Sequence, residues 1–135
     1  MQFLPSEPVW LPAEVIISYN RQHVAQTGEN HAVLFPEKLD GALQRAITSW
    51  HYNSNHDAVS LAVICMEAIA SAHAFEQGNK RTAFDAGFVF LMANGYELLE
   101  EADQDIVAVA FIELIERKRN AASFEALLKE FVVPR

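Results

Sequence analysis

Apolar residues recur along much of the chain at the spacing of amphipathic helices. Between residues 37 and 51 they return at intervals of three and four, so that they share one face of a helix. The same spacing predicts three more helices, over residues 12–26, 103–118 and 123–132, the last with Ser123 as a candidate cap. Each of these helices has one face to bury, so they must pack around an apolar centre.

Two further stretches, residues 57–71 and 82–93, are apolar on nearly every side. A helix without a polar face belongs in the core of a protein, and we expect these two to form a central helical hairpin. Asn94 and Gly95 end the second helix, because glycine readily adopts the left-handed conformation that commonly terminates helices.

The segments between the helices have less regular patterns. Residues 1–11 are proline-rich and predict an extended arm whose apolar side chains hold it to the core. Residues 27–36 are polar and then briefly apolar, which is too short for a helix and predicts a short hairpin or flap. Residues 96–99 form a short extended piece, and the polar run before the first core helix offers Asn55 or Asp57 as its N-cap.

Together these elements predict an all-α protein, a compact bundle of about six helices with a central helical hairpin and a candidate small β flap. With 135 residues and 51% hydrophobic content, we expect a single domain over residues 1–135, with its extended arm at 1–11. The chain has no run of about 18 apolar residues and no signal-peptide pattern at its start, which predicts a soluble, cytoplasmic protein without membrane contact.

The net charge and the cysteine content limit the classes of function that the protein can have. The formal net charge of −8 argues against a general nucleic-acid binder, because neutralisation of phosphate charge dominates that affinity. If the protein binds a phosphate group, a few nearby cationic or N–H groups must therefore bind it, because the overall charge repels it. The single cysteine, Cys65, lies in an apolar run, so it forms no intramolecular disulfide and is better interpreted as a small buried side chain than as a catalytic thiol.

Chemically active residue types are concentrated in the turn between the two apolar helices. Gly78 precedes the second helix, where unpaired N–H groups favour an anion, and Lys80 and Arg81 add full positive charge at the same place. His73 ends the incoming helix, where a neutral imidazole can take a proton from a hydroxyl, as phosphoryl or nucleotidyl transfer requires. The alternative is that His73 only caps the helix and the two cations form a solvated face. Because all these features occur in one turn, we favour the site.

The segment HAFEQGNKRTA, residues 73–83, resembles the signature of the Fic/Doc superfamily, HPFx(D/E)GNGRxxR. It is closer to HxFx(D/N)(G/A)NKRTA, the pattern of the death-on-curing (Doc) toxin branch. Three more segments are similar to the family's opening helix, to the helix after its flap and to its FLxxNGY continuation: LPAEVIISYNRQHV, LDGALQRAITSW and FVFLMANGYEL. The likeness extends over roughly residues 11–132 and implies the Fic/Doc helical fold.

The resemblance also implies a role for each residue of the motif. His73 would be the general base that activates the target hydroxyl, and Phe75 the buried anchor of the loop. The phosphates of the nucleotide would be bound by Gly78, Asn79, Lys80 and Arg81. The family's acidic residue, which holds Mg²⁺ on those phosphates, falls on Gln77, so the affinity for the metal should fall unless the neighbouring Glu76 compensates.

Two positions separate the chain from Fic enzymes that transfer nucleotides. Lys80 replaces a glycine of their motif, and Phe84 stands where their second arginine contacts the terminal phosphate. The Doc branch shares both features, which implies a toxin that passes the terminal phosphoryl group of ATP to a threonine of elongation factor Tu and so blocks translation. The alternatives are a Fic-type enzyme that adds AMP or another NMP to a protein hydroxyl, and a non-catalytic binding protein of the same fold, which Gln77 makes credible.

Regulation and docking follow from the same resemblance. The chain has no (S/T)xxxE(G/N) pattern, the mark of the inhibitory helix of many relatives, so inhibition would come in trans from an antitoxin of a toxin–antitoxin system. In the Doc branch this partner is Phd-like and folds a disordered tail onto the toxin. The target protein would dock on the flap, at Val33, Leu34 and Phe35.

Overall fold

The computed structural model describes residues 2–99 and 104–135, and within them it confirms the all-α fold. Its elements are, in chain order, α1 (Ala13–Thr27), α2 (Pro36–Asn53), α3 (Ala58–Ala72), α4 (Asn79–Ala93), β1 (Tyr96–Leu98), α5 (Gln104–Ile115), α6 (Ala121–Lys129) and β2 (Val132–Pro134). Every helix expected from the apolar pattern is present, with ends that differ by a few residues. Among the described helices, none is long and apolar enough to cross a membrane.

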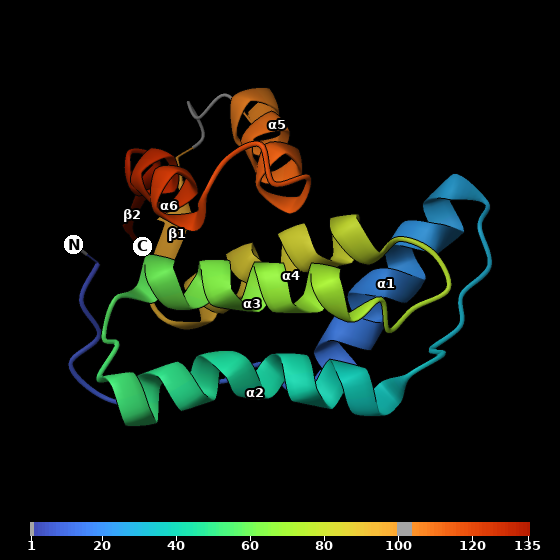
Figure 1. The fold of residues 1–135 in the computed structure, drawn as a ribbon, viewed down its shortest axis with the longest axis horizontal. Coiled ribbons are helices and arrows are strands. Elements are labelled where there is room, and N and C mark those ends of the chain that lie inside the picture. The colour runs from blue at the N-terminus through green and yellow to red at the C-terminus, as the bar shows by residue number, and fades with distance from the viewer. Residues whose placement is uncertain (1, 100–103) are drawn as a thin grey trace.

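The two most apolar helices, α3 and α4, form the expected central hairpin. α2 packs along the other side of α3, and α1 lies against α4, while α5 and α6 cover the edge of the hairpin opposite α2 (Figure 1). Most side chains of α3 are buried, because its sequence offers hardly any polar position. The hairpin is therefore a rigid support for the loop that joins its two helices.

Specific residues set the ends of the hairpin helices. Asp57, one of the two expected caps, accepts hydrogen bonds from the backbone N–H of Val59 at 3.0 Å and of Ser60 at 3.4 Å. α4 begins at Asn79, three residues earlier than its apolar pattern predicts, because Gly78 in the left-handed region turns the chain directly into the helix. The residues that carry the charge of the motif thus lie in the first turn of α4 and not in a loop before it.

The prediction for the last helix was wrong at both ends. α6 starts at Ala121, and its cap is Asn120, whose side chain accepts from the N–H of Ser123 at 2.8 Å, so Ser123 is not the cap. The helix stops at Lys129, and Val132 belongs to β2, which pairs antiparallel with β1. Val132 and Val133 are β-branched and precede a proline, a combination that favours a strand over a helix.

The helix expected over residues 103–118 is shorter than its pattern. Residue 103 lies outside the described residues, and α5 ends at Ile115. Arg117 has a φ of 62°, in the left-handed region, so the chain has left the helix before residue 118. The apolar spacing predicted the helix correctly but carried no information on where the turn begins.

Residues 28–35, which we name the flap, do not form a hairpin. They run beside the loop between α3 and α4 and make an isolated antiparallel bridge between Val33 and Phe75. The N–H of Leu34 donates to the carbonyl of Ala74 at 2.8 Å, and the N–H of Glu76 donates to the carbonyl of Ala32 at 3.0 Å. The flap is thus attached by main-chain hydrogen bonds to the segment that follows His73.

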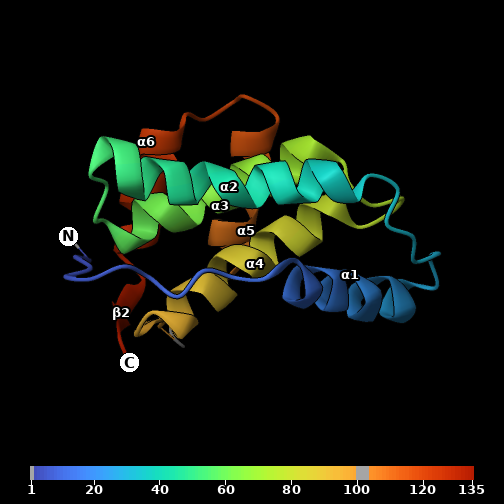
Figure 2. The same cartoon turned by 90° about the horizontal axis from the view of Figure 1, so that it is seen from below.

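The N-terminal arm is extended, as expected, and runs along the helices toward α1 (Figure 2). Leu4 is buried, and its N–H donates to the carbonyl of His56 at 2.7 Å. A backbone bridge between Phe3 and Asp57 lies beside this bond. The arm therefore joins the hairpin at the start of α3, far from the loop at the end of α3.

Cys65 is buried in α3, and this burial raises the pKa of its thiol from 9.0 to about 12. The thiolate is the reactive form, so iodoacetamide at pH 8 should leave the native protein unmodified and should label it fully in urea, as measured by intact mass. The unfolded thiol ionises near pH 9.0 and the folded one near 12, so the free energy of unfolding should also fall as the pH rises through that interval. Rapid labelling of the native protein would contradict the burial.

Candidate active site

The motif loop, residues 73–78, connects α3 to α4 at the end of the molecule far from both termini (Figure 1). Its first residue, His73, has φ 48° and ψ 45° and an exposed side chain. A residue with a Cβ in this left-handed region costs roughly 1–2 kcal/mol, and such strain is concentrated at functional sites. Here it turns the chain sharply out of α3 and leaves the imidazole at the surface.

Phe75 and Asn79 close the motif loop. The side chain of Phe75 is buried, as expected for an anchor. The side-chain amide of Asn79 accepts from the N–H of Phe75 at 3.1 Å and donates to its carbonyl at 2.8 Å. Because both polar atoms of this amide bind the loop itself, Asn79 has only its backbone N–H to offer to an anion.

Gly78 is the residue on which the loop geometry depends. Its φ of 76° is unfavourable for any residue with a side chain, and a Cβ there would lie 2.9 Å from Cδ2 of His23 and 3.2 Å from Nδ2 of Asn20. The loop therefore packs directly on α1 at this point. The N–H groups that follow belong to the first turn of α4, where they have no helical partner and can bind an anion.

A pocket of about 440 Å³ opens over the loop and the start of α4. It brings together the expected general base and every motif residue expected to bind phosphate or metal: His73, Glu76, Gln77, Gly78, Asn79, Lys80 and Arg81. It adds His23 of α1 and Glu29 of the flap. Of the other expected residues, Phe75 is buried and does not line the pocket, and Val33, Leu34 and Phe35 also lie outside its lining.

The two cations of the motif are available to a ligand. Lys80 is exposed, and Nε of Arg81 lies 3.1 Å from Oδ1 of Asp85, one helical turn further along. The side chain of Arg81 is 60% exposed, and exposed pairs of this kind contribute only about 0.3–0.5 kcal/mol. A phosphate can therefore compete for the guanidinium without a large loss.

A second hollow of about 310 Å³ continues from the first between α1 and α4. The two share His23 and Arg81, and the second is lined further by Tyr19, Gln22, Gln26, Asp85, Phe88 and Val89. Together they form a groove that passes over the start of α4. The groove leaves space beside the motif loop for more than a single phosphate group.

The residues present can hold Mg²⁺ only with help from a ligand. The pocket contains the carboxylates of Glu29 and Glu76 and the amide of Gln77, and within the described residues no group of three His, Cys, Asp or Glu side chains could hold a metal ion. Mg²⁺ is usually bound through one or two carboxylates together with substrate phosphates. The donor set therefore fits a metal that arrives with a nucleotide, and Glu76 and Gln77 are the side chains that would hold it.

Asn20 is a further residue of the site that the sequence analysis missed, besides His23 and Glu29 of the pocket lining. It lies at the centre of the buried stripe of α1, between Ile16 and Val24, and its side chain is fully buried. An amide on the apolar stripe of a helix is the signal that could have identified it, because a buried polar group needs partners. Those partners lie in the motif loop, in α4 and in the flap.

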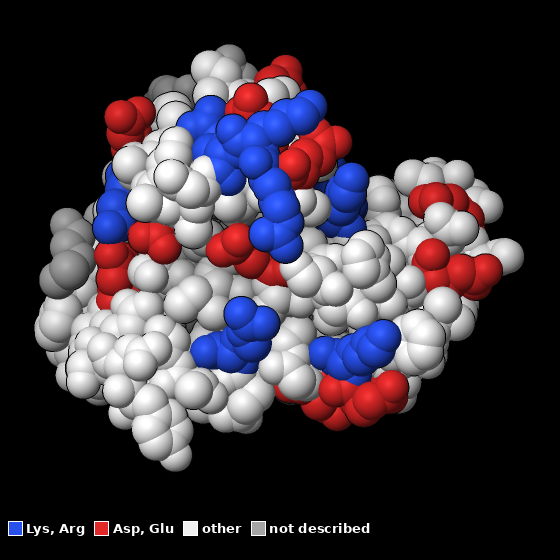
Figure 3. All heavy atoms as spheres, in the orientation of Figure 1, with Lys and Arg blue, Asp and Glu red and all other residues white. Residues whose placement is uncertain are grey.

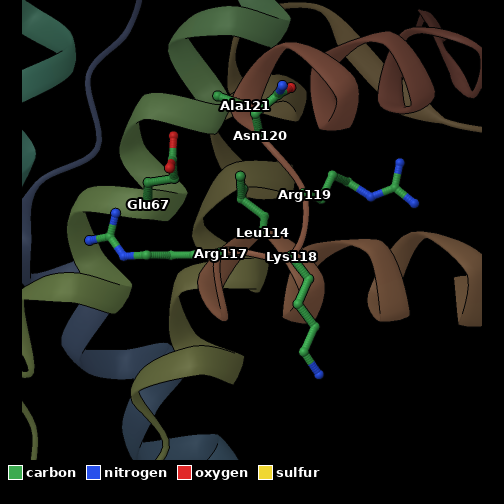
Figure 4. Close-up of a pocket in the computed structure, with 7 residues that line it drawn as sticks. All are labelled: Glu67, Leu114, Arg117, Lys118, Arg119, Asn120 and Ala121. Atoms are coloured by element: carbon green, nitrogen blue, oxygen red, sulfur yellow. The ribbon is translucent and has the colours of Figure 1, made fainter.

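The basic run Arg117 to Arg119 forms a second cationic region, over the turn between α5 and α6 (Figure 3). Acidic residues are interspersed there, and Arg119 pairs with Glu113 at 3.0 Å. The three cationic side chains point in different directions around their pocket, and only Arg117 extends toward Glu67 (Figure 4). They do not converge on one point as a phosphate site requires.

Glu67 faces the pocket of this basic run from α3. Burial, and then the carboxylate of Glu125, raise the pKa of Glu67, while Arg45 and Arg117 act in the opposite direction. Arg117 is thus partly occupied with an internal carboxylate. The motif loop remains the better candidate for a phosphate site, because its cations lie at a helix N-terminus beside a histidine.

Comparison with known families agrees with this geometry. The model of the Fic/DOC family matches residues 10–91, which extend from just before α1 to the last turns of α4 and include the whole motif loop. A search of the curated proteins gave no match. The family match does not separate the Doc branch from the others. Because the match covers more than half of the 135 residues, the chain belongs to the Fic/DOC family.

Proposed function

We propose that the chain is a protein-modifying transferase of the Doc type, which moves the terminal phosphoryl group of ATP to a hydroxyl of a target protein. One observation carries the proposal: His73 shares a pocket with the N-terminus of α4, Lys80 and Arg81. A base and an anion site within one pocket are what transfer of a phosphoryl group to a hydroxyl needs.

In the proposed reaction the imidazole of His73 takes the proton of the target hydroxyl. The hydroxyl oxygen attacks the γ-phosphorus, the bond from that phosphorus to the bridging oxygen breaks, and its electron pair leaves with ADP. Lys80, Arg81 and the first N–H groups of α4 stabilise the negative charge on the phosphoryl oxygens. Bound Mg²⁺ would neutralise part of the phosphate charge, held by Glu76 and Gln77.

Nucleotidyl transfer is the second candidate, and the position of Phe84 argues against it. The ring of Phe84 packs edge-on against Phe88 with centroids 4.8 Å apart, and it lies 5.3 Å from the ring of Phe111. This position, where Fic enzymes have their second arginine by resemblance, is thus part of an aromatic cluster and supplies no charge to a phosphate. A non-catalytic binding role is the third candidate, favoured only by the neutral Gln77.

The proposed target is elongation factor Tu, which would make the protein a cytoplasmic inhibitor of translation, held inactive by a Phd-like antitoxin in trans. The flap offers a docking surface beside the pocket, since the side chains of Leu34 and Phe35 are 50% and 40% exposed. No role in nucleic-acid or membrane binding is proposed. Mass spectrometry of elongation factor Tu after incubation with the protein and ATP tests the proposal, because phosphoryl and adenylyl groups differ greatly in mass.

The variant Gln77→Asp should raise the activity at limiting Mg²⁺. A carboxylate offers full charge where the amide offers one neutral oxygen, so we expect the Mg²⁺ concentration for half-maximal transfer to fall by about tenfold. Transfer rates measured across a Mg²⁺ titration check this, with Glu76→Gln as the partner variant, which should shift the midpoint the other way. An unchanged midpoint in both variants would show that neither side chain binds the metal.

A further inference from the structure

One buried side chain connects three parts of the site. Asn20 is fully buried in α1, and its Nδ2 donates to the carbonyl of Gln77 at 2.8 Å and to Oγ1 of Thr82 at 3.0 Å. Its Oδ1 lies 2.9 Å from Nδ1 of His31 in the flap. The motif loop, the first turns of α4 and the flap are therefore all attached to a single amide.

The orientation of this amide is determined by its partners. The carbonyl of Gln77 can only accept a hydrogen bond, so the NH₂ group of Asn20 must face it. The oxygen then faces His31, whose Nδ1 must carry the hydrogen. All three contacts are satisfied in one arrangement, and the reversed amide would place two oxygens against each other.

The contact with Gln77 also fixes the next N–H of the chain. The bond between Gln77 and Gly78 is trans, and in a trans peptide the N–H points opposite to the C=O. With the carbonyl of Gln77 turned toward Asn20, the N–H of Gly78 points away from it, and Gly78 lines the phosphate pocket. Within residues 2–99 and 104–135, this N–H makes no hydrogen bond.

We propose that Asn20 is a positioning residue: it holds the Gln77–Gly78 peptide in the orientation that presents the Gly78 N–H to a bound phosphate. The same amide holds the flap through His31, so the docking surface and the phosphate site share one support. The inference rests on the proposed function only in taking this pocket to bind phosphate. Asn20 itself touches no reacting atom.

The variant Asn20→Asp isolates this role. Its carboxylate keeps an acceptor for His31 but loses both donors and repels the carbonyl of Gln77. Thr82→Val is the matched control, because it removes the other acceptor of the same buried amide and leaves the contact with Gln77 in place. Both variants damage one buried network, so a merely structural role for Asn20 would affect them alike.

The measurement is an NMR titration of the amide resonances with inorganic pyrophosphate. In the wild-type protein we expect the Gly78 resonance to be among those that move most. The dissociation constant should rise by about tenfold or more in Asn20→Asp, the effect of one lost hydrogen bond to a charged group, and should stay within about twofold of wild type in Thr82→Val.

The outcomes separate the positioning role of Asn20 from the proposed function. Equal affinities in wild type and Asn20→Asp would overturn the positioning role and leave the proposed function standing, whereas no pyrophosphate binding by the wild type would overturn both. If Asn20→Asp does not fold, the wild-type titration still decides whether the Gly78 N–H binds phosphate, and an unmoved Gly78 resonance overturns the positioning role. A shift confined to Lys80 and Arg81, with the Gly78 resonance unmoved, would show that this peptide presents no donor to the phosphate.

Discussion

Replacement of His73 by alanine should lower the rate of phosphoryl transfer by at least about 100-fold, because a positioned general base typically contributes 10²–10⁴-fold. Nucleotide affinity should change little, since the proposed phosphate contacts come from the first turn of α4 and not from the imidazole. The rate is measured as phosphate incorporated into the target per minute at saturating ATP. Expression of the variant should likewise no longer arrest cell growth.

Two control variants separate the chemistry from the backbone. His73→Asn keeps a residue that tolerates the left-handed region, so its loss of activity would reflect the missing base and not the strain at φ 48°. His23→Ala removes the other imidazole that lines the pocket and should retain most of the activity. If His73→Ala remained fully toxic to cells, the protein would act by binding alone, which is the non-catalytic reading.

A helix could be predicted from the sequence wherever it buries one apolar face or is apolar on nearly every side. Residues 57–71 and 82–93 are apolar on nearly every side, and this predicted the central hairpin, because a helix without a polar face must be buried in the core. β2 was missed because Val132 continues the apolar spacing of α6. The two β-branched residues before Pro134 favour a strand locally, but the edge with which they pair belongs to β1, far away in the chain.

The site was predictable to the extent that it is continuous in sequence. Residues 73–81 act through a turn and a helix N-terminus, both of which are local features. His23 lines the pocket, and Asn20 joins the motif loop to His31 of the flap, only through tertiary packing, because these residues lie far from the motif in the sequence. A pattern search along the chain therefore finds the motif and misses the residues of α1 and the flap that pack against it.

Loop geometry and core packing are coupled in this fold. His73 leaves α3 and Asn79 starts α4, so the separation of those two helices sets the positions of the base and the anion site. The separation depends on side chains well below the loop. A change at the crossing of α3 and α4 should therefore affect both stability and transfer.

Gly87 marks that crossing. A Cβ built on it would lie against the side chain of Met66, which is fully buried in α3, with Cγ at 2.6 Å and Sδ at 2.8 Å. Gly87→Ala should therefore lower the free energy of unfolding by about 1–3 kcal/mol, the usual cost of overpacking a core. A glycine-to-alanine change inside a helix ordinarily raises the free energy of unfolding by about 0.5–1 kcal/mol, so a loss at this position would be the reverse of the usual effect.

Gly41 provides the matched control for this prediction. It lies inside α2, is exposed, and a Cβ there would meet nothing within 4 Å. Gly41→Ala should therefore raise the free energy of unfolding by about 0.5–1 kcal/mol, measured by urea denaturation under the same conditions as Gly87→Ala. The two variants add the same methyl group to the same kind of backbone. Opposite signs would assign the loss at Gly87 to the contact between α3 and α4, whereas equal shifts would show that Met66 moves aside and that this crossing does not fix the loop above it.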